Sequence, residues 1–178
     1  MQRVLVLGPG GAGKSVLARE LAGITGLSLV HLDREFWGPG WVKPDRDAWL
    51  AKIDHLLAGD AWIADGTHLD TLDYRLARAD GVILLDYSRF VALKGVFTRI
   101  LRRRGRHRPD LAPGCNNRLD RDYASWVWTY PRVTRPALTA LLAQHSDHIT
   151  VTTLRSRRHA ARWLDSIRAT STRGAINA

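Results

Sequence analysis

The residues best suited to chemistry lie near the start of the chain, where Gly8 to Ser15 read Gly-Pro-Gly-Gly-Ala-Gly-Lys-Ser. They fit the Walker A pattern G-x-x-x-x-G-K-[ST], with Gly8, Gly13, Lys14 and Ser15 at the four specified positions. Glycines let successive backbone N–H groups turn toward a polyphosphate, the lysine ammonium neutralises the outer phosphates, and the serine hydroxyl is a ligand for Mg²⁺. The pattern therefore predicts a bound nucleoside triphosphate.

The residues on either side of this loop fit the same interpretation. Val4 to Leu7 form a continuous apolar run typical of a buried parallel strand, and Val16, Leu17 and Leu21 follow the loop at helical spacing. A strand, a glycine-rich loop and a helix in this order aim a helix N-terminus at an anion. We expect the nucleotide to contact Gly8, Gly10, Gly11, Ala12, Gly13, Lys14, Ser15 and Val16.

Length and composition are those of a globular protein. The 178 residues suit a single domain, 1–178, and the one cysteine, Cys115, excludes an internal disulfide framework. No apolar stretch is long enough to span a bilayer, so we expect a cytoplasmic protein without a membrane partner. The net charge of +10 comes mostly from arginine. It would suit phosphate or nucleic-acid ligands, and a coding bias without function would produce it equally well.

Apolar segments of two kinds alternate along the chain. Strands are expected at Val4–Leu7, Leu27–Leu32, Ala61–Ala64, Gly81–Asp86 and His148–Thr152. Helices are expected after the loop and at Asp45–Leu57, Leu69–Ala77, Phe90–Arg104, from Leu119 with interruptions at Pro131 and Pro136, at Ala137–Ala143 and at Ser156–Ile167. On the helix from Phe90 we expect Val91, Leu93, Val96, Phe97, Ile100 and Leu101 to face inward. The alternation predicts an α/β fold with a parallel sheet covered on both faces, followed by a flexible polar tail, 170–178.

Two aspartates stand where strands are expected to end. Asp33 follows the second strand, and ligands of open α/β sheets bind at the carboxyl ends of strands, so Asp33 should face the same crevice as the glycine-rich loop. Asp86 follows four apolar residues, which is typical of a Walker B strand and equally compatible with an ordinary buried strand. Between Phe36 and Trp41, glycine and proline are too dense for regular structure, which predicts a loop that is mobile or covers the substrate.

Trp37 and Trp41 in that loop either stack on a flat acceptor or anchor the loop. The residues His31, His68 and Cys115 do not have the spacing of a metal site.

Six segments together resemble one family. They are Gly8 to Ser15, His31-Leu32-Asp33, Trp62 to Gly66, Arg75 to Asp86, Arg108-Pro109-Asp110 with Gly114-Cys115, and Trp126-Val127-Trp128. This combination resembles P-loop nucleoside-monophosphate-kinase-like proteins, and more closely the topology modulation proteins and adenylate-kinase-related kinases. The resemblance covers nearly the whole chain and implies a five-stranded parallel sheet in the order 2-3-1-4-5, with an arginine-rich lid at roughly 104–118.

The resemblance also implies a role for particular residues. Lys14 and Ser15 would hold the β- and γ-phosphates and Mg²⁺, with Asp86 as a further metal-binding group. Asp33 and Asp65 would line the acceptor pocket, and either would orient the attacking oxygen or accept its proton. The arginines of the lid would be Arg99, Arg103, Arg108 and Arg118, and the residues against the adenine would be Leu154 and Arg155.

These expectations describe a kinase that transfers the γ-phosphoryl group of Mg·ATP to a small-molecule acceptor. The acceptor is left open among nucleotides, nucleosides and hydroxylated metabolites, because the chain departs from true adenylate kinases at His31 to Trp37 and after Asp65-Gly66. In the first of these segments Arg34 is the candidate to replace the missing phosphate ligand. GTP remains an alternative donor. Two other functions also remain open: a nucleotide-dependent nucleic-acid-binding regulator, and an NTPase switch whose acceptor is water. For the arginine cluster, a solvated basic helix end is the alternative to a lid.

Overall fold

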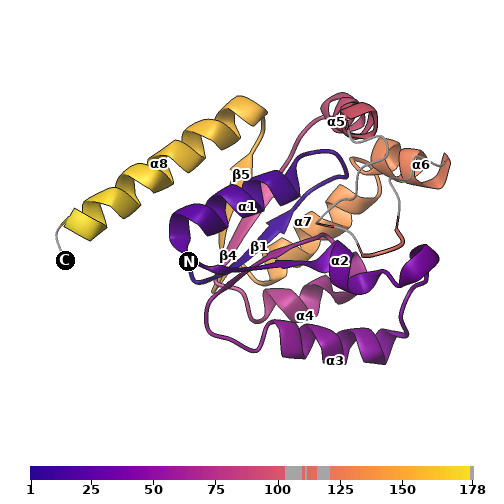
Figure 1. The fold of residues 1–178 in the computed structure, drawn as a ribbon, viewed down its shortest axis with the longest axis horizontal. Helices are drawn as coiled ribbons and strands as arrows, with labels where there is room; N and C mark the ends of the chain where they lie inside the picture. The colour runs from indigo at the N-terminus through magenta and orange to yellow at the C-terminus, as the bar shows by residue number, and fades with distance from the viewer. Residues whose placement is uncertain (103–109, 111, 116–120, 177–178) are drawn as a thin grey trace.

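The computed structural model describes residues 1–102, 110, 112–115 and 121–176. In these residues five parallel strands form one sheet in the order β2-β3-β1-β4-β5 (Figure 1), which confirms the predicted order. The strands are β1 (Arg3–Leu7), β2 (Ser28–His31), β3 (Trp62–Asp65), β4 (Gly81–Leu85) and β5 (Thr150–Leu154). All five occur near the predicted apolar runs, and β5 begins two residues later than expected.

Helices cover both faces of this sheet. They are α1 (Lys14–Thr25), α2 (Leu32–Phe36), α3 (Arg46–Leu56), α4 (Leu72–Leu76), α5 (Arg89–Arg102), α6 (Arg121–Thr129), α7 (Thr134–Gln144) and α8 (Arg157–Ile176). Helices α1 and α8 lie together on one face, and α3, α4 and α7 lie on the other (Figure 1). Helices α5 and α6 pack on each other beyond the carboxyl ends of the strands. This arrangement leaves that end of the sheet as the place for a ligand.

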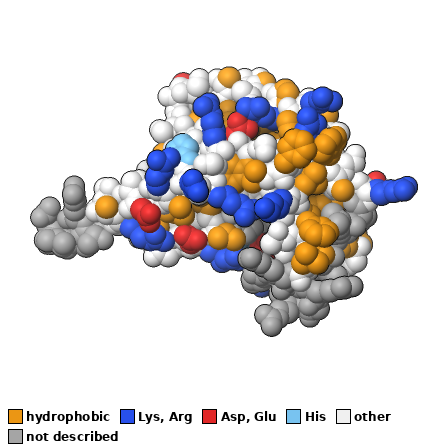
Figure 2. Space-filling view, turned by 90° about the horizontal axis from the view of Figure 1, so that it is seen from above, with side chains coloured by type: hydrophobic (Ala, Val, Ile, Leu, Met, Phe, Trp, Pro, Cys, Tyr) orange, Lys and Arg blue, Asp and Glu red, His pale blue; other side chains and the backbone are white. Residues whose placement is uncertain are grey.

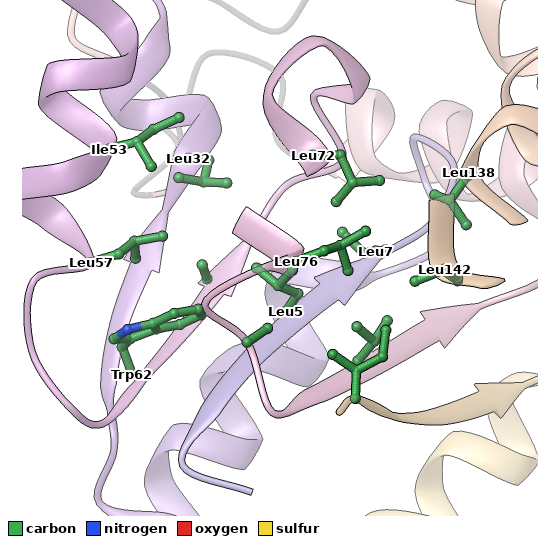
Figure 3. Close-up of a cluster of buried hydrophobic side chains, with 14 of the residues drawn as sticks. Leu5, Leu7, Leu32, Ile53, Leu57, Trp62, Leu72, Leu76, Leu138 and Leu142 are labelled. Carbon is green, nitrogen blue, oxygen red and sulfur yellow. The ribbon is translucent and has the colours of Figure 1, made fainter. Parts of the chain in front are cut away.

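Side chains alternate across the central strand and build two apolar cores. Leu5 and Leu7 of β1 face the core shared with α3, α4 and α7, which Figure 3 shows, whereas Val4 and Val6 face the core shared with α1 and α8. All four side chains are at most 2% exposed. A strand buried on both faces is a rigid base for the loop that follows it.

Several local predictions were wrong at element ends. The second strand stops at His31, and Asp33 lies in α2, because Leu32 and Phe36 are one helical turn apart and both are buried against the core. The loop expected at Phe36 to Trp41 contains the end of α2 and a 3₁₀ helix, Pro39–Trp41. Its Gly40 has the positive φ of 73° that favours glycine.

The C-terminal half also differs from its prediction. Pro136 does not interrupt a helix but lies in the first turn of α7, where a missing backbone N–H costs nothing. Helix α8 continues to Ile176, past the expected end at Ile167. The flexibility of 170–178 and the single-domain boundaries stay predictions.

Helix α5 buries fewer apolar side chains than predicted. Ala92 and Val96 are buried, whereas Val91 is 38% exposed and Phe97 and Leu101 are each 58% exposed. Apolar residues occur all round this helix, and the described residues cover only one side of it. Figure 2 shows hydrophobic side chains among lysines and arginines on the surface seen from above. Within the described ranges, no helix is long and apolar enough to cross a membrane.

Candidate active site at the P-loop

The loop from Gly8 to Gly13 connects the central strand to α1 as its sequence predicts. Gly13 is the N-cap of α1 with φ 97°, and it forms no side-chain cap. The N–H groups of Lys14 and Ser15 therefore keep their capacity to bind an anion, whereas that of Val16 donates to the Gly13 carbonyl oxygen at 3.1 Å. The ammonium of Lys14 lies 3.1 Å from the carbonyl oxygen of Gly8 and 3.2 Å from that of Pro9, so its charge stands at the loop.

A first cavity, here called the P-loop cavity, has a volume of about 470 Å³. The loop from Gly10 to Ser15 forms part of its wall, together with residues of α1, α5 and α8. Ser15 and Val16, which are predicted to contact the nucleotide, also line it. Helix α8 contributes Arg157 and Leu164 to its wall. The dimensions and the backbone donors fit a nucleotide whose phosphates rest on the loop.

A second cavity, here called the aromatic cavity, has a volume of about 710 Å³. Five aromatic side chains contribute to its wall: Phe36, Trp37, Trp41, Tyr123 and Trp126. The rings of Trp37 and Trp41 meet edge to face, with centroids 5.2 Å apart. Both tryptophans therefore wall a cavity and also pack against each other, so the two interpretations of these residues are compatible.

The two cavities share part of their lining. Gly10, Lys14, Asp33, Arg99 and Tyr123 line both. A phosphate held at the P-loop and a compound in the aromatic cavity would therefore approach each other beside Lys14.

Asp33 is the carboxylate placed at this junction. Its Oδ1 lies 2.9 Å from Nε2 of His68, and the two side chains are 45% and 11% exposed. The ring of His68 lies against Phe36, with centroids 4.6 Å apart, and also contacts Trp49. Sequence reasoning considered His68 only as a metal ligand and missed this pairing, since the two residues are 35 positions apart.

Asp65 is placed differently from Asp33. It is 4% exposed and lines neither cavity, and its Oδ2 lies 3.0 Å from Nδ1 of His31 on the neighbouring strand. Its other carboxylate oxygen, Oδ1, has no hydrogen-bond partner within the described part of the chain. Of the two carboxylates predicted at the acceptor, the structure brings only Asp33 to a cavity wall.

Asp86, predicted as a metal-binding group, is also turned elsewhere. It lines neither cavity, and its carboxylate forms an ion pair with Arg135 of α7 at 2.6 Å. The pKa of the Tyr130 hydroxyl is raised mainly by burial and further by the nearby Asp86 carboxylate. The backbone N–H of Arg135 donates a hydrogen bond to the carbonyl oxygen of Tyr130. The strand before Asp86 is buried as expected, but the metal role of Asp86 stays a prediction.

Ser15 is the oxygen-bearing side chain at the metal position of the Walker A pattern, and it lines the P-loop cavity. Mg²⁺ on a nucleotide takes most of its ligands from phosphates and water and needs only one or two protein oxygens. Among the described residues, no group of three or more His, Cys, Asp or Glu side chains could hold a metal ion by itself. The hydroxyl of Ser15 suits a metal ion that arrives with the nucleotide.

Of the four arginines predicted to belong to the lid, Arg99 lies within the described residues. It lines both cavities, and its guanidinium donates a hydrogen bond of 3.3 Å to the hydroxyl of Tyr123. The Nε of Arg99 is buried and has no partner among the residues that the structure describes. Arg103, Arg108 and Arg118 lie outside the described residues, as does most of the lid predicted at 104–118.

The residues predicted against the adenine are not at a cavity. Leu154 is fully buried in the core under α8, and Arg155 is exposed and lines neither cavity. The first turns of α8 contribute Arg157, Ala160 and Ala161 to the P-loop cavity instead. Because β5 runs to Leu154, two residues further than expected, Leu154 lies in the strand and not after it. The contact of Leu154 and Arg155 with the adenine stays a prediction.

Sequence reasoning also gave no role to Arg75. This residue of α4 is fully buried, and its guanidinium donates hydrogen bonds to the carbonyl oxygens of Gly66, Thr67 and His68. Burial lowers the pKa of Arg75 to about 10, and the carboxylates of Asp70 and Asp33 oppose this decrease. The side chain therefore stays a cation at neutral pH.

The strand order, the loop between β1 and α1 and the lysine at its end define the fold of P-loop kinases. No protein-family model and no curated protein matches the chain. A solved sugar kinase from a Janibacter species is 17% identical, with 96% of this chain and 92% of that one covered and a TM-score of 0.50.

Two further kinase structures are similar at lower TM-scores. A gluconokinase from Sinorhizobium meliloti is 16% identical over 99% of this chain and 94% of that one, with a TM-score of 0.49. A deoxyadenosine kinase from M. mycoides with bound dCTP is 12% identical over 93% and 98% of the two chains, with a TM-score of 0.47. At these identities the similarity concerns the fold alone.

Proposed function

We propose that this protein is a kinase that transfers the γ-phosphoryl group of Mg·ATP to a hydroxyl group of a small molecule bound in the aromatic cavity. The observation that carries the proposal is the lining shared by the two cavities, with Lys14, Asp33 and Arg99 at their junction. A phosphoryl donor and an acceptor need such adjacent sites, because transfer requires their reacting oxygens in line. A cytoplasmic location is part of the proposal.

On the donor side, backbone N–H groups of the P-loop would bind the phosphates and Lys14 would neutralise charge on the outer ones. Ser15 would hold Mg²⁺, which when bound would neutralise charge on the β- and γ-phosphate oxygens. Arg99 lies on the wall of both cavities and would stabilise charge on the group in transfer.

On the acceptor side, Asp33 would accept the proton of the attacking hydroxyl. The hydroxyl oxygen forms a bond to the γ-phosphorus, the bond from that phosphorus to the β–γ bridging oxygen breaks, and ADP leaves with the electron pair. His68 would keep the Asp33 carboxylate in place through the 2.9 Å contact of Nε2. The aromatic walls would exclude water, which otherwise competes as an acceptor.

The proposal is tested by measuring ADP release with a panel of nucleosides, nucleoside monophosphates and hydroxylated metabolites. We expect one acceptor class to raise turnover well above the rate with ATP alone. Lys14→Ala should lower that turnover by at least about a hundredfold, since it removes a charge from the transferred group. The matched control is Lys94→Ala, because Lys94 is an exposed lysine of α5 that lines neither cavity.

Three outcomes would contradict the proposal. If ATP is hydrolysed at a rate that no acceptor changes, the protein is an NTPase switch. If DNA or RNA stimulates that hydrolysis in a salt-dependent manner, the nucleic-acid-binding alternative is correct. Equal loss in Lys14→Ala and Lys94→Ala would show that the P-loop lysine has no special part in the reaction.

A further inference from the structure

Three consecutive residues after β3 contact both sides of the proposed reaction. They are Gly66, Thr67 and His68, here called the 66–68 segment. The carbonyl oxygens of these residues accept hydrogen bonds from the guanidinium of Arg75, at 3.0 Å for Gly66, 2.6 Å for Thr67 and 2.8 Å for His68. A single buried cation thus fixes the backbone of the whole segment.

The first contact of the 66–68 segment is with the donor side. The hydroxyl of Thr67 accepts a hydrogen bond of 3.2 Å from the backbone N–H of Gly8 and donates one of 2.8 Å to the carbonyl oxygen of Gly8. Thr67 is 6% exposed, so these bonds are shielded from water. Gly8 is the first residue of the P-loop, and its φ of 142° is one that L side chains rarely adopt. Thr67 therefore holds the P-loop at its start.

The second contact of the segment is with the acceptor side. His68 places Nε2 on the carboxylate of Asp33 while its backbone has φ 30° and ψ 77°, a left-handed conformation that costs energy in a residue other than glycine. Such a conformation persists only where its surroundings enforce it, and the bond from Arg75 to the His68 carbonyl is one such constraint. The direction of the imidazole therefore depends on Arg75.

Burying an arginine is costly, and the carboxylates of Asp70 and Asp33 offset that cost for Arg75 only in part. Turn carbonyls are satisfied by water or by backbone N–H groups in most loops. Here two of the three bonded carbonyls belong to Thr67 and His68, whose side chains hold Gly8 and Asp33. We propose that Arg75 is a positioning residue of phosphoryl transfer, which acts through Thr67 and His68 to set the P-loop and the Asp33 carboxylate at a fixed separation. This inference rests on the proposed function and adds to it a residue outside both cavities.

The test compares isosteric variants of the three residues. Thr67→Val removes the hydroxyl and keeps the shape, His68→Phe removes the ring nitrogens and keeps the aromatic contacts, and Arg75→Lys keeps a charge but not the three-way fork. Thr67→Ser and His68→Gln are the rescue variants, because each restores a hydrogen-bonding group. Arg78→Lys is the matched control, since Arg78 lies close to Arg75 in the chain and donates to Asp54 and to the Leu57 carbonyl instead.

The measurements are kcat and KM for ATP and for the acceptor, and hydrogen exchange of the peptide that covers the P-loop. Thr67→Val should speed P-loop exchange about fivefold or more and raise the KM for ATP, because a buried hydrogen bond is lost. His68→Phe should lower acceptor-dependent kcat about 10- to 100-fold and leave P-loop exchange unchanged. Arg75→Lys should produce both effects, and Arg78→Lys neither.

The inference is overturned if folded Thr67→Val and His68→Phe match Arg78→Lys in exchange, KM and kcat, or if their rescue variants recover nothing. Melting curves identify variants that fail to fold. If Arg75→Lys fails to fold, Thr67→Val and His68→Phe decide whether the 66–68 segment positions the P-loop and Asp33. If the wild-type protein has no acceptor-dependent turnover, the proposed function fails. The exchange and ATP-affinity measurements then still decide whether Arg75 and Thr67 hold the P-loop.

Discussion

Replacing Asp33 by asparagine is expected to lower acceptor-dependent turnover by about 10²- to 10⁴-fold, the usual contribution of a general base. The amide keeps the size of the carboxylate and its place beside His68 but is a far weaker proton acceptor. Nucleotide affinity should change much less than kcat, because the backbone donors of the P-loop and Lys14 remain. The measurement is steady-state kinetics with the acceptor found by the ADP-release screen, together with nucleotide binding at equilibrium.

Two other aspartates are the controls for this variant. Asp70 lines the aromatic cavity but not the P-loop cavity, so Asp70→Asn should affect the KM for the acceptor more than kcat. Asp65 lines neither cavity and holds His31, so Asp65→Asn should lower thermal stability more than kcat. If Asp65→Asn abolishes transfer while Asp33→Asn retains most of it, the roles assigned to the two carboxylates are reversed.

Replacing Gly95 by alanine is expected to destabilise the protein by about 1 to 3 kcal/mol, although alanine favours helices. Gly95 lies inside α5, where a Cβ would overlap the carbonyl oxygen of Gly11 in the P-loop. Gly11 in turn has φ 81°, and a Cβ there would overlap the Ala92 carbonyl oxygen. Helix and loop thus approach backbone to backbone, and an added methyl group would separate them. Nucleotide affinity should fall as well.

Gly23→Ala is the matched control for this prediction. Gly23 lies inside α1 with nothing near its would-be Cβ, so alanine should stabilise the protein by about 0.5 to 1 kcal/mol. Denaturant unfolding of both variants, with and without nucleotide, measures the difference. If Gly95→Ala gains as much stability as Gly23→Ala, helix α5 does not rest on the P-loop in solution.

Local patterns predicted the fold well because the chemistry of its central unit is local. The four apolar residues of β1, the spacing of Gly8, Gly13 and Lys14, and the apolar positions of α1 are adjacent in the chain, and each predicts its own structure. Repeated alternation of apolar strands and helices then restricts the connections to a few right-handed ones. The strand order itself came from the resemblance to P-loop kinases, and the structure confirms it.

The site was predicted less completely because its contacts join distant segments. Thr67 and Gly8 are 59 residues apart, and His68 and Asp33 are 35 apart, so no periodicity connects them. Asp33 was assigned to the correct crevice but to the wrong element, since a single turn of helix is too short to show a period of 3.6 residues. Asp86 matched a loose pattern, which does not reveal that Arg135 takes its carboxylate.

The aromatic cavity makes the protein its own optical probe. Trp37, Trp41 and Trp126 line it, and no tryptophan among the described residues lines the P-loop cavity. Three of the seven indoles of the chain therefore lie at the acceptor side. A compound that enters the aromatic cavity would change the intrinsic emission of these indoles by direct contact. Unlabelled protein can thus be used to follow the occupancy of the aromatic cavity.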